Sequence, residues 1–139
     1  RLQPLAGSHD CTLYDDSYNA NPLSVIAAAE FLAGLGGESW LVLGDLKELG
    51  ADAERMHSEV GDAARDAGVS RLYTLGELAR HSATEFGEGA ASFDDIDALI
   101  AVLLDVKRCV KLLVKGSRSM RMERVVDALS APVPARKEA

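Results

Sequence analysis

The sequence predicts an α/β fold, Rossmann-like and doubly wound: a mostly parallel sheet of about six strands, with helices on both faces and an antiparallel N-terminal strand. Short continuous apolar runs recur along the chain, as is typical of strands that are covered on both faces. Between them lie segments whose apolar residues are three and four positions apart, which is the spacing of a helix. Repeated alternation of strand and helix favours a parallel sheet, because each helix returns the chain to the same end of the sheet.

The first half of the chain is expected to contain three strands and two helices. Residues 1–5 and 9–14 indicate two short strands joined by a turn. A helix should begin at Pro22, with Asn21 as its cap, and end at Gly36 and Gly37. A buried strand at residues 40–43 and a helix at 52–67 should follow, with Gly68 as the stop signal.

The second half repeats this pattern. Strands are expected at residues 69–75, 91–93 and 110–114, and helices at 77–86, after Asp94 or Asp95, and at 119–129. We expect residues 1–130 to form a single domain of a larger protein, and residues 131–139 to form a mobile tail. The length of 139 residues is sufficient for one core that buries about two-thirds of the unfolded surface.

Composition and charge exclude several classes of function. The net charge of -7 disfavours nucleic-acid binding, and the chain contains neither a long apolar span nor a basic-then-apolar leader. Lys115, Arg118, Arg121 and Arg124 against Glu123 give residues 115–124 a local charge of +3 that would attract an anion. Cys11 and Cys109 lie in apolar runs and are interpreted as buried, reduced thiols.

Polar side chains are concentrated in residues 15–22, with the sequence DDSYNANP. This segment connects an expected strand to an expected helix, and open α/β sheets bind ligands in such loops. Its carboxylates, phenol and carboxamides can bind a ligand, although Asp and Asn are also favoured in turns for purely local reasons. The loops at 44–48 and 115–118 should lie along the same edge of the sheet, which is the predicted site.

The usual phosphate-binding and nucleophilic motifs are missing from the sequence. It contains neither G-x-x-x-x-G-K-[ST] nor G-x-G-x-x-G, and no convincing Ser-His-Asp or Cys-His arrangement. The three histidines are far apart, so no metal site is predicted. His57 follows the apolar stripe of its helix and is interpreted as a packing or capping residue. By itself, the chain is expected to catalyse nothing.

Four segments together resemble the C-terminal domain of the Mur ligases. They are residues 15–22 (DDSYNANP), 43–50 (LGDLKELG), His57 and 115–120 (KGSRSM), in the order and at the spacing of that family. The resemblance covers roughly residues 2–129. Within the family, the sequence is most similar to the branch that adds D-alanyl-D-alanine to UDP-N-acetylmuramoyl-tripeptide. The resemblance implies a bacterial, cytoplasmic, ATP-dependent ligase of peptidoglycan precursor synthesis. It further implies that N-terminal and central domains are missing from this sequence, and that the central domain holds most of the phosphates and Mg²⁺.

The same resemblance implies roles for individual residues. Asp16 matches the family's aspartate that binds the ribose of ATP, and Tyr18, Asn19 and Asn21 match the segment along the nucleoside. The loop with Lys115, Gly116, Ser117 and Arg118 matches the region near the dipeptide, whose carboxylate its cations would bind. Charge alone suggests Asp45 and Glu48 as contacts for the dipeptide's ammonium. A solvated basic face is the alternative for Lys115 and Arg118.

Two other functions also fit part of the sequence. A phospho-receiver domain needs an acidic pair, a phosphorylatable Asp and a Lys at successive strand ends. Asp15, Asp16 and Lys115 match, but the expected strand at 69–75 leads into Gly76 and Glu77 with no Asp. A catalytically idle interaction domain is the other alternative; it would tolerate substitution of Asp16, Asn19 and Lys115.

Overall fold

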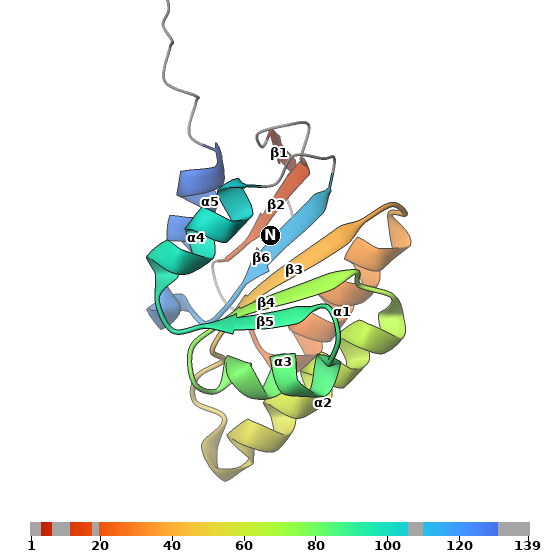
Figure 1. Ribbon diagram of the computed structural model, residues 1–139. Coiled ribbons are helices and arrows are strands. Elements are labelled where there is room, and N and C mark those ends of the chain that lie inside the picture. The colour runs from red at the N-terminus through yellow and green to blue at the C-terminus, as the bar shows by residue number, and fades with distance from the viewer. Residues whose placement is uncertain (1–3, 7–11, 18–19, 106–109, 131–139) are drawn as a thin grey trace, which may run out of the picture.

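One six-stranded sheet organises the computed structural model, which describes residues 4–6, 12–17, 20–105 and 110–130. The strand order is β1-β2-β6-β3-β4-β5 (Figure 1). β1 pairs antiparallel with β2, and all other neighbours are parallel. The strands are β1 (Pro4–Ala6), β2 (Thr12–Asp16), β3 (Ser39–Gly44), β4 (Arg71–Leu75), β5 (Ala90–Phe93) and β6 (Lys111–Lys115). The predicted fold class is therefore confirmed. Cys11, Cys109 and the predicted tail lie outside the described residues.

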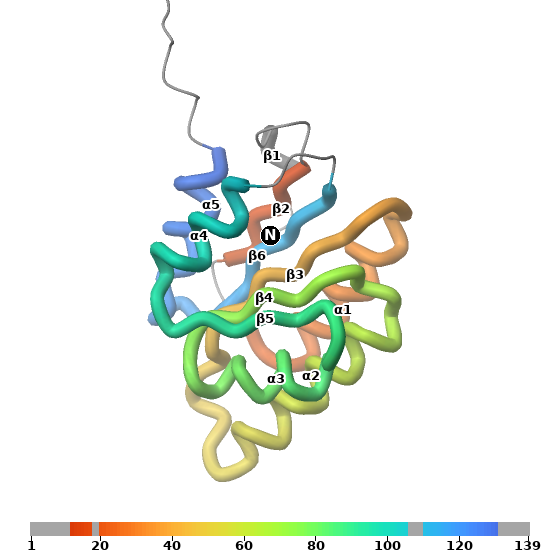
Figure 2. The backbone as a smooth tube through the Cα atoms, viewed as in Figure 1, coloured from red at the N-terminus to blue at the C-terminus, as the bar shows by residue number. Residues whose placement is uncertain are grey.

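Helices cover both faces of this sheet, as predicted. Figure 2 shows α1, α2 and α3 together on one side and α4 and α5 on the other. Their bounds are α1 (Pro22–Gly34), α2 (Ala53–Ala67), α3 (Ala79–Phe86), α4 (Ile96–Leu104) and α5 (Glu123–Ser130), with short 3-10 turns η2 (Gly50–Asp52) and η3 (Arg118–Met120). Among the described residues, no helix is long and apolar enough to cross a membrane.

Each face of the sheet has its own hydrophobic core. On the side of α1, α2 and α3, Leu41, Leu43 and Leu113 of the sheet pack with Val25 and Val60. On the side of α4 and α5, the sheet contributes the aromatic pair Trp40 and Tyr73, whose ring centroids are 5.1 Å apart, together with Leu112 and Val114. Because adjacent side chains on a strand point to opposite faces, the continuous apolar runs fill both cores.

Local signals fix the start of α1 as predicted. Asn21 Oδ1 accepts a hydrogen bond from the Ser24 backbone N–H at 2.9 Å, and the Ser24 hydroxyl lies 3.0 Å from the Asn21 backbone nitrogen. Pro22 occupies the first helical position, where its missing N–H is not needed. The cap therefore fixes the end of the loop that follows β2.

The C-terminal segment differs from the prediction of one helix over residues 119–129. The structure has η3 and then α5, separated by Arg121 and Met122, and Arg121 adopts a left-handed conformation with φ of 53°. Arg124 donates from Nε to the Arg121 carbonyl at 2.9 Å and from Nη2 to the Met120 carbonyl at 2.8 Å, which satisfies groups that a continuous helix would have bonded. The turn brings the fully buried Met122 against Gly44 and Gly116.

The close approach of α2 and α3 yields a stability prediction. A Cβ at Gly61 would lie 2.1 Å from the backbone oxygen of Ser82, whereas one at Gly34 would meet nothing within 4 Å. We expect Gly61→Ala to destabilise the chain by about 1–3 kcal/mol through overpacking. Gly34→Ala, the control, should stabilise it by about 0.4–1 kcal/mol. Urea unfolding measures both, and equal stability changes in the two variants would contradict the packing described here.

Candidate functional site

The site lies where β2, β3 and β6 end. β6 pairs in parallel with both β2 and β3, so the loops that leave these three strands are neighbours at one edge of the sheet. The structure thus brings together the three segments that the sequence predicts as the site. Within the first of them, Tyr18 and Asn19 lie outside the described residues.

A buried ion pair joins the end of β2 to the end of β6. Asp16, the last residue of β2, is opposite Lys115, the last residue of β6. Lys115 Nζ donates to Asp16 Oδ2 at 2.6 Å, and the side chains are only 2% and 13% exposed, respectively. The alternative of a solvated basic face is therefore wrong for Lys115, which does not lie at the surface.

This pairing affects the ionisation of Asp16. Burial alone would raise the pKa of the Asp16 carboxyl, but hydrogen bonds and nearby positive charge, with those of Lys115 foremost, lower it, and the net result is a pKa below the ordinary value of 3.8. At neutral pH Asp16 is a carboxylate, and it can accept hydrogen bonds but not donate them.

The loop after β2 is ordered at both described ends. Ser17 donates to Asp15 Oδ1 twice, from its backbone nitrogen at 3.0 Å and from its hydroxyl at 2.6 Å. At the other end Asn21 caps α1 through its side-chain oxygen. Asn21 is nevertheless exposed, and it lines the cleft described below.

Backbone contacts hold the loops after β3 and β6 together. The Ser117 backbone N–H donates to the Asp45 carbonyl at 3.1 Å, and the Lys47 backbone N–H donates to the Ser117 hydroxyl at 2.7 Å. Gly116 allows this close contact, because a Cβ there would lie 2.6 Å from Met122 Cγ and 3.3 Å from the backbone of Gly44. Gly116 therefore has a clear steric role in forming the site.

Asp45 is buried, and its carboxylate bonds within the protein. Its Oδ1 accepts from the backbone nitrogen of Ala79, the first residue of α3, at 2.7 Å. Gly76 makes room for it: with φ of +112°, a Cβ there would lie 2.4 Å from Asp45 Oδ1. Lys47 Nζ lies 3.7 Å from Oδ2. The structure thus gives Asp45 the role of anchoring the loop to α3.

His57 of α2 also holds the loop after β3 in place. Its fully buried ring accepts from the Leu46 backbone N–H at Nε2 (3.0 Å), and its Nδ1 lies 2.7 Å from the Ala53 carbonyl. An acceptor role for Nε2 places the proton on Nδ1, which can then donate to Ala53. The prediction of a packing or capping residue is confirmed.

A cleft of about 660 Å³ opens between the three loops. Its charged lining residues are Lys47, Glu48 and Arg118, so both signs of charge are present. The other lining residues are Ala20, Asn21, Leu49, Ser117 and Ser119. Of the predicted site residues that the structure describes, Asn21, Glu48, Ser117 and Arg118 line the cleft, and Asp16, Asp45, Lys115 and Gly116 do not.

Glu48 adopts an uncommon backbone conformation at the rim of this cleft. Its φ of 63° is in the left-handed region, which residues other than Gly, Asn and Asp seldom adopt. Strained residues of this kind are enriched at functional sites. A glycine would adopt this backbone conformation at lower cost, so the side chain at position 48 lowers the stability of the loop.

A family model describes this chain. The model for the Mur ligase, glutamate ligase domain, matches residues 1–118. The chain belongs to the Mur ligase family. It is 43% identical over 132 residues to the UDP-N-acetylmuramoyl-tripeptide–D-alanyl-D-alanine ligase of Escherichia coli. This match covers 93% of the present chain and 29% of the E. coli enzyme. The enzyme of the same name from Haemophilus influenzae is 34% identical, over 93% of this chain and 29% of its own length.

Solved structures of Mur ligases have the same fold as this domain. A MurF crystal structure from Acinetobacter baumannii superimposes with a TM-score of 0.85 at 26% identity, over 95% of this chain and 30% of that one. The MurF ligase from Thermotoga maritima, solved in complex with ADP, gives 0.81 at 25% identity, over 94% and 30%. The chain thus spans less than a third of these relatives. This family assignment favours neither a phospho-receiver nor an idle interaction domain.

Four cleft residues of this Mur ligase domain were not predicted from the sequence: Ala20, Lys47, Leu49 and Ser119. Their positions next to predicted residues were the available signal. No group of three or more His, Cys, Asp or Glu side chains in the described part of the chain could hold a metal ion.

The Asp16–Lys115 pair predicts how stability depends on pH. Because the folded-state pKa of Asp16 is lowered, its contribution to stability is present above 3.8 and is lost as the pH falls through the lower folded-state pKa. We expect Asp16→Asn to be less stable than the parent at neutral pH, and this difference to shrink in acid. Urea unfolding between pH 2 and 7 measures it, with the exposed Asp66→Asn as control. A difference that is constant with pH would contradict the pairing.

The His57 contacts predict a further change in stability. His57→Leu leaves the buried Leu46 backbone N–H without its acceptor, which should destabilise the chain by about 1–3 kcal/mol. His81→Leu is the matched control, because His81 is partly exposed on α3, 3.8 Å from Glu54, and should change stability by less than about 0.5 kcal/mol. Similar values for the two variants, measured by urea unfolding, would show that His57 does not anchor the loop.

Proposed function

We propose that this chain is the C-terminal domain of a ligase that joins D-alanyl-D-alanine to UDP-N-acetylmuramoyl-tripeptide with ATP. The observation that carries the proposal is the cleft, which presents both signs of charge directly beside the loop that follows Asp16. The 43% identity to the E. coli enzyme of that name supports the choice of substrates. Residues 1–130 are proposed as the domain, and the bacterial cytoplasm as its location.

The proposed reaction has two steps. The carboxylate of the UDP-linked peptide takes the γ-phosphoryl group of ATP, which gives an acyl phosphate and ADP. The amine of D-alanyl-D-alanine then attacks the acyl carbon, inorganic phosphate leaves with the electrons of the broken C–O bond, and the amine nitrogen loses a proton. Mg²⁺ and the phosphates are assigned mainly to the central domain of the ligase, as the resemblance to the Mur ligases implies. This domain contributes binding and orientation.

The nucleoside is assigned to the loop after β2. Asp16 is a carboxylate at neutral pH and can accept hydrogen bonds from both ribose hydroxyls, each such charge-assisted bond contributing about 1.5–3 kcal/mol. Asn21 lies at the cleft, and its amide nitrogen can donate while its oxygen caps α1. Tyr18 and Asn19, in the same loop, complete the proposed nucleotide contacts.

The dipeptide is assigned to the cleft itself. D-Alanyl-D-alanine is a zwitterion, and the cleft offers Glu48 for its ammonium and Arg118, with Lys47, for its carboxylate. The hydroxyl of Ser117 already accepts from Lys47 but can donate as well. Gly116 contributes by keeping the loop close to Gly44. Asp45 is buried and bonded to Ala79, so the ammonium is assigned to Glu48 rather than to Asp45.

The strained Glu48 provides the test of this proposal in the full-length ligase. Glu48→Gly removes both the left-handed strain and the carboxylate, so the variant should gain up to about 1 kcal/mol of stability. Its KM for D-alanyl-D-alanine should rise about tenfold, because a charge-assisted contact is lost. Its KM for ATP should stay unchanged. Turnover is followed as phosphate release that requires both the dipeptide and UDP-N-acetylmuramoyl-tripeptide.

Arg121→Gly is the matched control. Arg121 has the same left-handed backbone, with φ of 53°, but is not among the residues that line the cleft. It should be stabilised in the same way and keep the parent KM for both substrates. An unchanged KM for D-alanyl-D-alanine in Glu48→Gly would show that the cleft is not the binding site of the dipeptide. Phosphate release that needs neither the dipeptide nor the UDP-linked peptide would overturn the proposed reaction.

A further inference from the structure

Lys115 and Asp16 are placed together by the register of the sheet. They are the last residues of β6 and β2, and they are direct partners in the parallel pairing of these strands. Lys115 shares a face of β6 with Leu113, and Asp16 shares a face of β2 with Tyr14, because every second side chain points the same way. Leu113 and Tyr14 both pack in the core beneath α1 and α2. The pair is therefore on the α1 side of the sheet.

Lys115 is unsuited to bind a ligand directly. Its side chain is 2% exposed and is absent from the lining of the cleft, where Lys47 and Arg118 supply the positive charge. Its ammonium already donates to Asp16 at 2.6 Å. A substrate carboxylate would have to enter the core and displace Asp16 to reach Lys115, which would leave a buried carboxylate without its partner.

Asp16, in contrast, keeps the capacity to bind a ligand while it is held. A carboxylate has two oxygens with about four lone-pair positions, so it can accept hydrogen bonds from more than one donor at a time. The Lys115 ammonium fixes the side chain in one orientation and keeps it ionised. Both effects favour a group that has to accept hydrogen bonds from two adjacent hydroxyls.

We propose that Lys115 is a positioning residue for the nucleotide, which acts only by holding the Asp16 carboxylate, and that it does not contact the dipeptide. This rests on the proposed function, since it takes Asp16 as the ribose contact. It replaces the assignment of Lys115 to the dipeptide, and it leaves Ser117 and Arg118 as the substrate contacts of the loop after β6.

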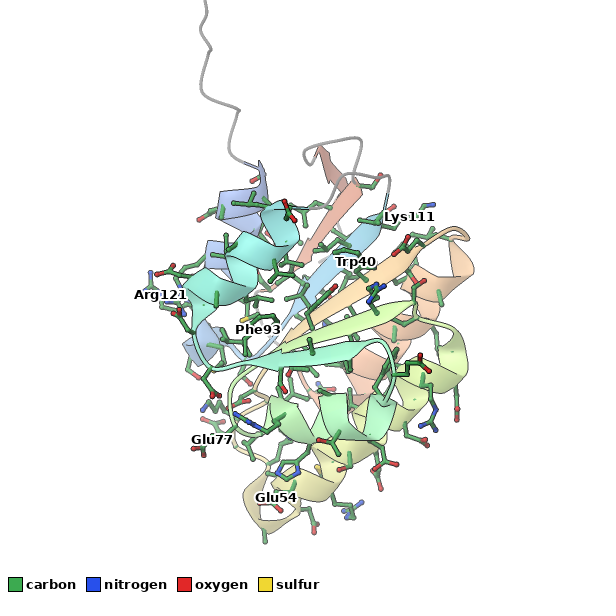
Figure 3. The ribbon with its side chains drawn as sticks, in the orientation of Figure 1. Trp40, Glu54, Glu77, Phe93, Lys111 and Arg121 are labelled. Carbon is green, nitrogen blue, oxygen red and sulfur yellow. The ribbon has the colours of Figure 1, made fainter. Side chains whose placement is uncertain are left out.

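The test is a comparison of Michaelis constants in the full-length ligase. Lys115→Met should raise the KM for ATP about tenfold or more and leave the KM for D-alanyl-D-alanine unchanged. Lys111→Met is the matched control: it is the same residue type at the opposite end of β6 (Figure 3), where it donates to the Gly36 carbonyl at 2.9 Å. The control should keep both KM values. A raised dipeptide KM, or an unchanged ATP KM, in Lys115→Met would overturn the proposal.

A double-mutant cycle keeps the proposal testable if Lys115→Met alone folds poorly. Asp16→Asn and the double variant Asp16→Asn/Lys115→Met should have equal KM values for ATP, because Lys115 acts only through Asp16. A further rise in the double variant would show that Lys115 contacts the nucleotide independently, and would overturn the proposal. The Asp16→Asn variant separates a failure of the role proposed for Lys115 from a failure of the proposed function. If it keeps the parent KM for ATP, the proposed nucleotide site itself is wrong.

Discussion

The ion pair between Lys115 and Asp16 is the constraint on which the site depends. An ammonium group in a protein core is unfavourable unless it is paired, and Lys115 is among the largest fully buried side chains. Its bond to Asp16 is possible only while β2 and β6 keep their present register. A slip by one residue would turn Asp16 to the opposite face of the sheet. The pair thus links the correct assembly of the sheet to the position of a proposed ligand contact.

Supporting and ligand-facing roles are divided among neighbouring residues in the same loops. Backbone bonds of Ser117 and Lys47, the small size of Gly116, and the ring of His57 hold the loops in place. The charged ends of Glu48 and Arg118 remain at the cleft. These backbone and packing contacts therefore determine where those charges lie, as a preorganised binding site requires.

Local signals in the sequence were sufficient for the fold class and for placing the loops after β2, β3 and β6 at one edge of the sheet. Apolar runs located the strands, and Asn21 with Pro22 located the start of α1, because these signals act over a few residues. The burial of Lys115 could not be predicted, since it depends on which strand becomes the neighbour of β6, and strand order leaves no local pattern. The same holds for Asp45, whose partner Ala79 is 34 residues away. The break at Arg121 was missed because residues 119–129 carry an uninterrupted helical pattern, and the contact of Met122 with Gly44 and Gly116 is a tertiary one.

The most direct test of this account is a crystal structure of the full-length ligase with ADP and D-alanyl-D-alanine bound. The account predicts a ribose hydroxyl within hydrogen-bond distance of Asp16, with Lys115 Nζ still bonded to that carboxylate, and the dipeptide between Glu48 and Arg118. A nucleoside bound away from Asp16, or Lys115 turned out of the core to a ligand, would contradict it.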